Sequence, residues 1–181
     1  MSRGPGKREE AVFDTSPLIF LSRLHLLERS LDLFSESLLA ESVRVEVVDQ
    51  GKTLGTPEVT EVEALLASGR LVVRKAPATA VATRLKLNPK LSKADRDTLA
   101  IASEAGRRVL ADDAAVRSVA RQLGLPLGGT LSVLFSLVDS GRLESTQAIE
   151  LLDQLVDAGW YCSAQLYRAA RKALEDRLEG K

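Results

Sequence analysis

The segment Ala11–Pro17 (AVFDTSP) decides the fold class expected for this chain. A short apolar run, residues 11–13, stops at Asp14, and Ser16 and Pro17 follow as the N-cap and first residue of a helix. Leucines then recur at helical spacing. This order predicts a strand, a tight turn and a helix, with the acid at the carboxyl end of the strand.

Short apolar runs and longer amphipathic stretches alternate along the rest of the chain. Strands are predicted at 37–40, 71–73, 108–111 and 125–127, and helices at about 26–34, 57–68, 94–105, 114–123, 131–140, 145–158 and 163–178. Such alternation predicts an α/β protein whose parallel sheet carries helices on both faces. Ligands of these folds bind beyond the carboxyl ends of the strands, where Asp14 and Asp112 are expected.

Two segments are harder to assign. Residues 42–50 alternate valine with polar residues, which fits a strand or a helix. Gly51, read as a C-cap, favours the helix. Residues 77–89 are small and basic, and they receive no assignment.

Size and composition restrict the class of protein further. The chain has 181 residues, enough for one domain that needs no disulfide or structural metal to fold. The single cysteine excludes an internal disulfide and a zinc–thiolate cluster, and it fits a reducing compartment. Residues 1–10 lack the apolar core of a signal peptide, and no apolar stretch near the N-terminus is long enough to span a bilayer. We therefore expect a cytoplasmic protein without a membrane anchor.

The formal net charge is zero, but the charges are unevenly placed. Residues 28–63 carry nine acids and three bases, a net of −6, whereas residues 70–94 carry seven bases and no acid. A basic segment attracts nucleic-acid phosphates, although charge runs are as often merely solvated. The candidate RNA-binding residues are Arg74, Lys75, Arg84, Lys86, Lys90 and Lys93.

Several short motifs resemble those of PIN-domain ribonucleases in order and spacing. Residues 12–19 (VFDTSPLI) resemble the opening of that family, and residues 43–48, 95–102 and 106–112 resemble its second, third and fourth acidic motifs. Gly128-Gly129-Thr130-Leu131 followed by a helix, and the end Ala158-Gly159-Trp160-Tyr161, are similar to a VapC-like toxin subgroup. The resemblance covers about residues 11–175.

This resemblance implies a fold and a domain organisation. The fold is a PIN-like three-layer α/β/α arrangement with a central parallel sheet of four to five strands and extra C-terminal helices. Residues 1–10 are expected to be a flexible tail and residues 11–181 a single domain, of which about 142–181 form the helical extension. Residues 51–91 are longer than a minimal PIN domain needs, so nothing is carried over to them.

The resemblance also implies a metal-dependent endoribonuclease, often the toxin of a toxin–antitoxin pair. The implied catalytic acids are Asp14, Glu46, Asp97 and Asp112, with Asp14, Asp97 and Asp112 as ligands of Mg²⁺ or Mn²⁺. Supporting roles fall to Thr15, Ser16, Asp95, Asp113 and Thr130. The implied partners are an RNA substrate, a small antitoxin and a second copy of the chain.

Physical chemistry agrees with that assignment. Carboxylates that converge in a cleft repel one another unless some are protonated or a cation binds. Mg²⁺ and Mn²⁺ prefer oxygen ligands, and a bound metal can lower the pKa of water and stabilise charge on a phosphorane. With water as the nucleophile, the products would carry 5′-phosphate and 3′-hydroxyl ends.

Each candidate also has a structural explanation. Asp14 could cap the helix that follows it, and Asp112 or Asp113 could cap the helix from Ala114. Asp97 could be a first-turn acid that the helix dipole stabilises, and Glu46 could be a solvated helix residue. Asp95 fits a capping box with Ser92 better than it fits a metal site. The aromatic residues Trp160, Tyr161 and Tyr167 are predicted to close the core rather than to stack bases.

Three other functions compete with an RNA nuclease. A haloacid-dehalogenase-like phosphatase needs an Asp two residues after the first one, where this chain has Ser16. A non-catalytic PIN fold would be expected to lack some of the four acids, and all four are present. A DNA-directed nuclease stays open, because nothing in the sequence reads a 2′-hydroxyl.

Overall fold

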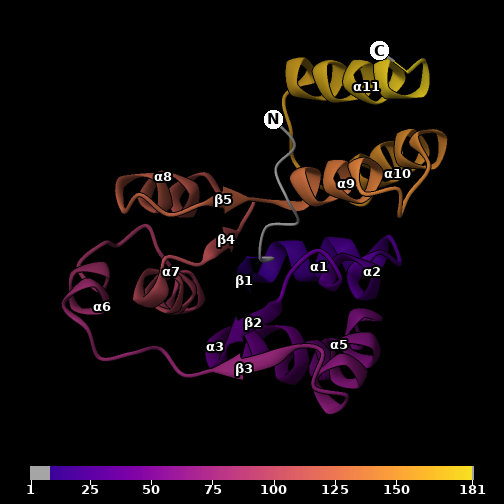
Figure 1. Cartoon of the computed structure of the whole chain (residues 1–181). Coiled ribbons are helices and arrows are strands. Elements are labelled where there is room, and N and C mark those ends of the chain that lie inside the picture. Colours follow the sequence, from indigo (N-terminus) through magenta and orange to yellow (C-terminus); the bar gives the residue numbers. More distant parts are fainter. Residues whose placement is uncertain (1–8, 181) are drawn as a thin grey trace.

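A computed structural model of the chain describes residues 9–180, which form a five-stranded parallel sheet with helices on both faces (Figure 1). The strand order is β3-β2-β1-β4-β5. The strands are β1 (Glu10–Phe13), β2 (Glu36–Ala40), β3 (Val72–Arg74), β4 (Arg108–Leu110) and β5 (Leu127–Gly128).

The sheet is buried around its central strand. In the register of β1, Phe13 lies beside Leu39 of β2 and Leu110 of β4, and all three side chains are inaccessible or nearly so. A strand covered on both faces needs apolar residues at consecutive positions, which explains the uninterrupted run at 11–13.

Helices complete the three layers. They are α1 (Thr15–Arg23), α2 (Leu27–Leu31), α3 (Glu41–Arg44), the π-helical segment η1 (Val45–Gln50), α4 (Gly51–Leu54), α5 (Glu58–Ala67), α6 (Ala80–Leu85), α7 (Lys93–Ala105), α8 (Ala114–Gln122), α9 (Thr130–Asp139), α10 (Ser145–Asp157) and α11 (Ala164–Leu178). Helix α7 packs on β1, β2 and β4 from one side, while α1, with α5 and α9, covers the other (Figure 1). The predicted three-layer α/β/α fold with C-terminal helices is confirmed.

The strand order places one edge of the sheet in a special position. From β1 the chain proceeds outward through β2 and β3, then returns to add β4 and β5 on the other side of β1. The direction therefore reverses between β1 and β4. In open α/β sheets, ligands bind at the carboxyl ends of the strands that flank such a reversal. Asp14 directly follows β1, and Asp112 lies just beyond β4.

The segment that was ambiguous in sequence is helical, but it does not end where predicted. A continuous helical run extends from Glu41 to Leu54 through α3, η1 and α4. Gly51 has a helical φ of −58°, and a Cβ there would lie 2.7 Å from Val59 Cγ2. Gly51 thus permits close approach of α5, and the left-handed C-cap is Gly55, with φ +68°. The prediction of a C-cap at Gly51 is wrong.

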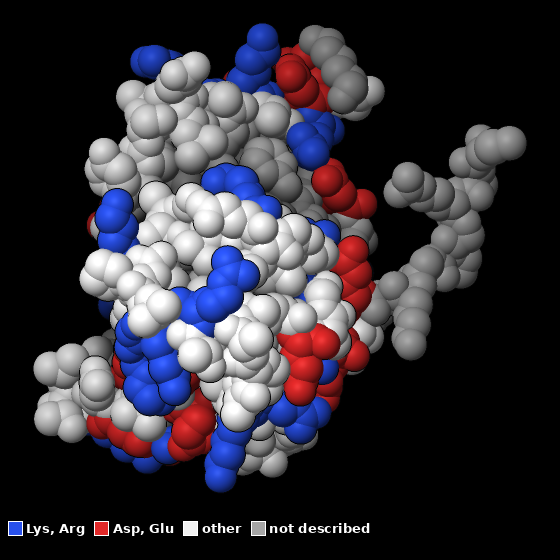
Figure 2. Space-filling view, turned by 90° about the vertical axis from the view of Figure 1, so that its left-hand side faces the viewer, with Lys and Arg blue, Asp and Glu red and all other residues white. Residues whose placement is uncertain are grey.

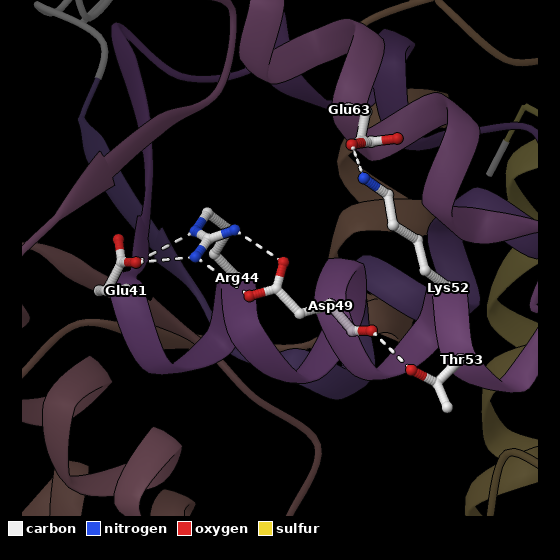
Figure 3. Close-up of polar contacts among 6 residues, drawn as sticks. All are labelled: Glu41, Arg44, Asp49, Lys52, Thr53 and Glu63. Carbon is white, nitrogen blue, oxygen red and sulfur yellow. Dashed lines mark hydrogen bonds and ion pairs between the residues drawn. The ribbon is translucent and has the colours of Figure 1, made fainter.

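Ion pairs stabilise the helical run from Glu41 to Leu54 (Figure 3). The Arg44 guanidinium contacts Glu41 at 2.9 Å and Asp49 at 2.9 Å. Asp49 is five residues beyond Arg44, the spacing that a π-turn brings onto one face. Lys52 of α4 pairs with Glu63 of α5 at 2.5 Å. These contacts stabilise the segment that carries Glu46.

Other boundaries refine the predictions. Helix α6 lies in the unassigned stretch 77–89, and the Thr79 hydroxyl caps it by accepting from the Ala82 N–H at 3.1 Å. Of the tail expected over 1–10, residues 1–8 lie outside the described part. Glu10 begins β1 and Glu9 pairs with Arg108 at 2.7 Å, so these two residues belong to the folded domain.

The C-terminal helices α10 and α11 pack against each other, and α10 also contacts α9. They account for the helical extension predicted at about 142–181, except Lys181, which lies outside the described residues. Across residues 9–180, none of the helices combines the length and apolar character that crossing a membrane requires.

Candidate active site

Asp14 is the most unusual carboxyl group in the described structure. Its side chain is 3% exposed, and its Oδ1 is buried without a hydrogen-bond partner. The backbone explains this placement, because the Asp14 N–H donates to the Leu110 carbonyl of β4 at 2.9 Å. Although Asp14 occupies the N-cap position of α1, its side chain makes no capping hydrogen bond. The structural explanation of this acid as a helix cap is therefore wrong.

The surroundings of Asp14 disfavour its ionised form. Burial, as the largest cause, and the negative charges of Asp95, Glu46 and Asp113 together raise its pKa from 3.8 to about 7. A backbone hydrogen bond at Thr15 opposes the shift. These three neighbours come from α7, η1 and the residues before α8, so the fold gathers acids from distant parts of the sequence around Asp14.

Glu46 is oriented by the residue that follows Asp14. The Thr15 hydroxyl donates to Glu46 Oε2 at 2.8 Å, which ties η1 to the start of α1. π-turns within helices are frequent at functional sites because they redirect side chains that a regular helix would turn away. The supporting role expected for Thr15 thus has a specific contact. The hydroxyl of Ser16, which was also expected to assist, makes no side-chain hydrogen bond within the described residues.

The two acids at the start of α7 have different surroundings. Asp97 Oδ2 accepts hydrogen bonds from the Ser42 hydroxyl at 2.7 Å and from Lys93 Nζ at 2.8 Å. Asp95 completes a capping box, since its Oδ2 accepts from the Ser92 N–H at 2.6 Å and its own N–H donates to Ser92 Oγ. The capping role predicted for Asp95 is confirmed. Asp95 nevertheless exerts the largest effect of any carboxylate on the pKa of Asp14.

Asp112 is held firmly beside β4. Its Oδ1 accepts from the Thr130 N–H at 2.9 Å, and its Oδ2 accepts from the Thr130 hydroxyl at 2.5 Å. Thr130 itself is fully buried. Asp113 caps α8 by accepting from the N–H groups of Ala115 and Val116, as its structural explanation predicted. The Thr130 hydroxyl thus orients Asp112, which is one of the roles expected for it.

The donors present suit a hard divalent cation. A buried carboxylate oxygen without a partner, in a group whose ionisation is disfavoured by neighbouring acids, gains most from a bound cation. Within residues 9–180, no three His, Cys, Asp or Glu side chains converge closely enough to form a complete ligand set. Mg²⁺ commonly binds through only one or two carboxylates, completed by waters and substrate phosphates. Asp14, aided by its acidic neighbours, fits that mode.

A basic groove of about 890 Å³ lies next to these acids. It is bounded by residues 75–83 on one side and α7 on the other, and the acids Asp97 and Glu41 line it. Its cations are Lys75, Lys86, Lys93 and Arg96. Figure 2 views the side of the molecule that carries α6, α7 and α8, and Lys and Arg side chains spread across it.

The candidate RNA-binding residues differ in whether they form ion pairs and in which hollow they line. Arg74 pairs with Glu36 at 3.2 Å, outside the basic groove, and Lys93 pairs with Asp97. Arg84 lines a separate hollow with Val81 and Leu85. Among the described residues, Lys75, Lys86 and Lys90 have no ion-pair partner, and the first two line the basic groove.

The chain is similar to proteins of known family. Its sequence matches DUF3368, a PIN domain, over residues 10–176. The chain belongs to this family. The match includes α10 and most of α11, so the C-terminal helices lie within the family's domain. Among curated proteins, no similar sequence was found.

A solved structure supports the PIN fold. It is a PilT N-terminus domain protein, SSO1118, from the hyperthermophilic archaeon Sulfolobus solfataricus P2. The similarity has a TM-score of 0.52 at 16% identity and covers 70% of this chain and 92% of that chain. At this identity the likeness concerns the fold alone.

Three residues of the site were missed in sequence. Ser42 contacts Asp97, but a serine at the start of a helix gives no signal for such a contact. Arg96 belongs to the basic groove, yet it lies beyond the acid-free stretch that was counted. Arg117 of α8 approaches Asp112 only because its guanidinium donates to the carbonyls of Ala111 and Gly128, each at 2.9 Å.

Proposed function

We propose that this PIN-domain protein is a metal-dependent endoribonuclease. The observation that carries the proposal is Asp14, a buried carboxyl group with an unpartnered oxygen at the carboxyl end of the central strand. PIN domains are typically nuclease modules, and the acids around Asp14 supply the oxygen ligands that Mg²⁺ or Mn²⁺ needs. The haloacid-dehalogenase alternative loses its support, since the chain belongs to the PIN family.

The residues would divide the work as follows. Asp14 would hold the divalent ion, with Glu46 and Asp95 as the acids best placed to assist. When bound, the ion supplies an activated water and neutralises charge on the reacting phosphate. Asp112, fixed by Thr130, would position a water or a further ligand from the β4 side. Asp97, engaged by Ser42 and Lys93, would act at the mouth of the basic groove.

The basic groove would hold the RNA backbone. Lys75, Lys86 and Arg96 are free of ion pairs among the described residues, so their charges remain available to phosphates. The groove lies against α7, the helix that carries Asp95 and Asp97. A strand that follows it would reach the acids with its phosphates already neutralised.

The test is cleavage of end-labelled RNAs of defined sequence in Mg²⁺, Mn²⁺ or EDTA. We expect cleavage that EDTA abolishes, leaving 5′-phosphate and 3′-hydroxyl ends, and a loss of about 10³-fold or more in Asp14→Asn. Circular dichroism checks that each variant is folded. Asp157→Asn, an exposed carboxylate at the end of α10, is the matched control and should cut like the wild type. Cutting that survives Asp14→Asn would overturn the proposal.

The same assay separates the two acids of α7. Because Asp95 interacts more strongly with Asp14, we expect Asp95→Asn to lose about 10²-fold or more in kcat. Asp97→Asn should lose less, since Ser42 and Lys93 already occupy one of its oxygens. The opposite order would restore Asp97 as the metal ligand, as the family resemblance implies.

The biological role belongs to the same proposal. The resemblance to VapC-like proteins supports a toxin that a small antitoxin neutralises, a homodimer and a cytoplasmic location. Induced expression of the wild type should arrest growth, whereas Asp14→Asn should not. Equal growth with both proteins, at equal expression, would argue against the toxin role while leaving the nuclease assay unaffected.

A further inference from the structure

A second hollow, separate from the basic groove, is lined by Asp112. This aromatic pocket has a volume of about 310 Å³ and lies between the end of β4, α9 and the connection from α10 to α11. Its lining includes Asp112, Arg117, Phe135, Trp160, Tyr161 and Leu166. It therefore shares an acid with the candidate active site but differs from the basic groove in chemistry.

The aromatic residues of the pocket are placed unequally. Trp160 is 7% exposed and forms part of the wall, as its predicted core role implies. Tyr161, which was predicted to close the core as well, is 93% exposed, so that prediction is wrong. The two rings follow Gly159, whose φ of +91° lies just beyond the end of α10. An exposed ring at the rim of a pocket is free to stack on a ligand.

The pocket also has a polar side. Arg117 is held in place by two backbone carbonyls, and burial lowers its pKa without removing the charge. Gly129 keeps the space beside Asp112 open, because a Cβ there would lie 2.5 Å from Asp112 Oδ1 and 2.9 Å from the Ala111 carbonyl. A planar ligand would thus meet aromatic faces on one side and fixed polar groups on the other.

We propose that the aromatic pocket binds one unstacked nucleobase of the nucleic-acid strand held at the active site. Aromatic side chains and an arginine form the usual platform for unstacked bases. The volume suits one planar ring system rather than a peptide segment. Continuity with Asp112 puts that base next to the reacting phosphate. This inference rests on the proposed function for the identity of the strand.

Binding can be measured without any cleavage. Trp160 is the only tryptophan of the chain, so its fluorescence reports directly on the pocket. In EDTA, a short single-stranded RNA should quench Trp160, while an abasic oligonucleotide of equal length and charge should not. A duplex of the same sequence should bind with less quenching, because its bases are stacked and paired.

Variants then assign the effect to the exposed ring. Tyr161→Ala should weaken binding of the single-stranded RNA about tenfold. Tyr161→Phe, which retains the aromatic ring, should bind like the wild type. Leu54→Ala, which truncates a largely exposed apolar side chain on α4, is the control and should behave like the wild type. Because Tyr161 is almost fully exposed, Tm should be unchanged in these variants.

Several results would overturn the inference. If the abasic and normal oligonucleotides quench Trp160 equally and Tyr161→Ala binds like the wild type, the pocket does not bind a base. If RNA is nevertheless cleaved, only the pocket assignment fails. If no oligonucleotide binds and none is cleaved, the proposed function fails with it. A Tyr161→Ala variant whose only change is a smaller mass in sedimentation would mark the pocket as an interface between copies.

Discussion

The α6–α7 side and the α9–α11 side each carry one acid of the candidate active site, Asp97 and Asp112, but offer different chemistry. The basic groove carries four cations on a wide surface lined by small side chains. The aromatic pocket is about one third of its volume and carries rings and a single arginine. Cations bind phosphates regardless of sequence, whereas rings and fixed polar groups select bases. One flank is thus suited to hold a strand and the other to choose where it is cut.

The acids on these flanks differ in the same way from the one between them. Asp97 on the groove side is engaged by Ser42 and Lys93, and Asp112 on the pocket side by Thr130. Asp14, between them, leaves Oδ1 without a partner. The flanking acids are positioned at some gain in stability, while the central one is left unsatisfied. Unsatisfied groups of this kind cost stability and persist where function requires them.

The largest effect should come from the cost of burying Asp14. A carboxyl group whose pKa is higher in the folded state binds its proton more tightly when folded, so stability falls as pH rises from the unfolded value of 3.8 through the folded value of about 7. In EDTA, we expect the free energy of unfolding of Asp14→Asn, relative to that of the wild type, to increase by about 2–3 kcal/mol as the pH rises from 5 to 8.

Chemical denaturation of both proteins at several pH values measures this gain. Mg²⁺ should stabilise the wild type at pH 8 and leave Asp14→Asn unchanged, because the variant lacks the charge that binds the cation. Asp157→Asn controls for the general change in charge. If the difference in stability between Asp14→Asn and the wild type does not vary with pH, the pKa of Asp14 is not raised in the metal-free protein.

The next largest effect should come from Thr130, which orients Asp112 beside the aromatic pocket. Thr130→Val removes the hydroxyl that donates to Asp112 but leaves the backbone N–H in place. Loss of one orienting contact should lower kcat about tenfold, with KM little changed. Thr130→Ser retains the hydroxyl and should recover most of the rate. If Thr130→Val changes KM alone, Asp112 contributes to binding rather than to the chemical step.

Much of this arrangement follows from local signals, and the remainder does not. Asp14 and Asp112 were placed at strand ends because each follows a buried apolar run, a pattern that needs no knowledge of the fold. Asp95 and Asp97 stand two residues apart on α7, so at about 100° per residue they face nearly opposite directions. Which of them faces Asp14 depends on how α7 packs on the sheet, which the sequence alone does not determine.

The two flanks were harder to predict for the same reason. The basic groove needs α6, whose capping residue Thr79 is an ordinary helix signal but whose few apolar residues show little periodicity. The aromatic pocket joins residues from 112 to 166, so it exists only after the C-terminal helices pack beside α9. Tyr161 shows the limit clearly, since it is adjacent to Trp160 in the sequence but is exposed where Trp160 is buried.

The smallest effect should come from the groove side. Lys75→Ala combined with Lys86→Ala removes two unpaired charges, and we expect RNA to bind about fivefold more weakly near physiological salt, equally for every sequence. The slope of log K against log salt should fall by about 1.4, because each lost contact with a single strand contributes about 0.7. Arg168→Ala with Lys172→Ala on α11 removes the same charge from positions that line neither the basic groove nor the aromatic pocket, and it serves as the control. A groove variant that weakens one RNA sequence far more than another would contradict the division of labour, because selection would then reside on the basic side.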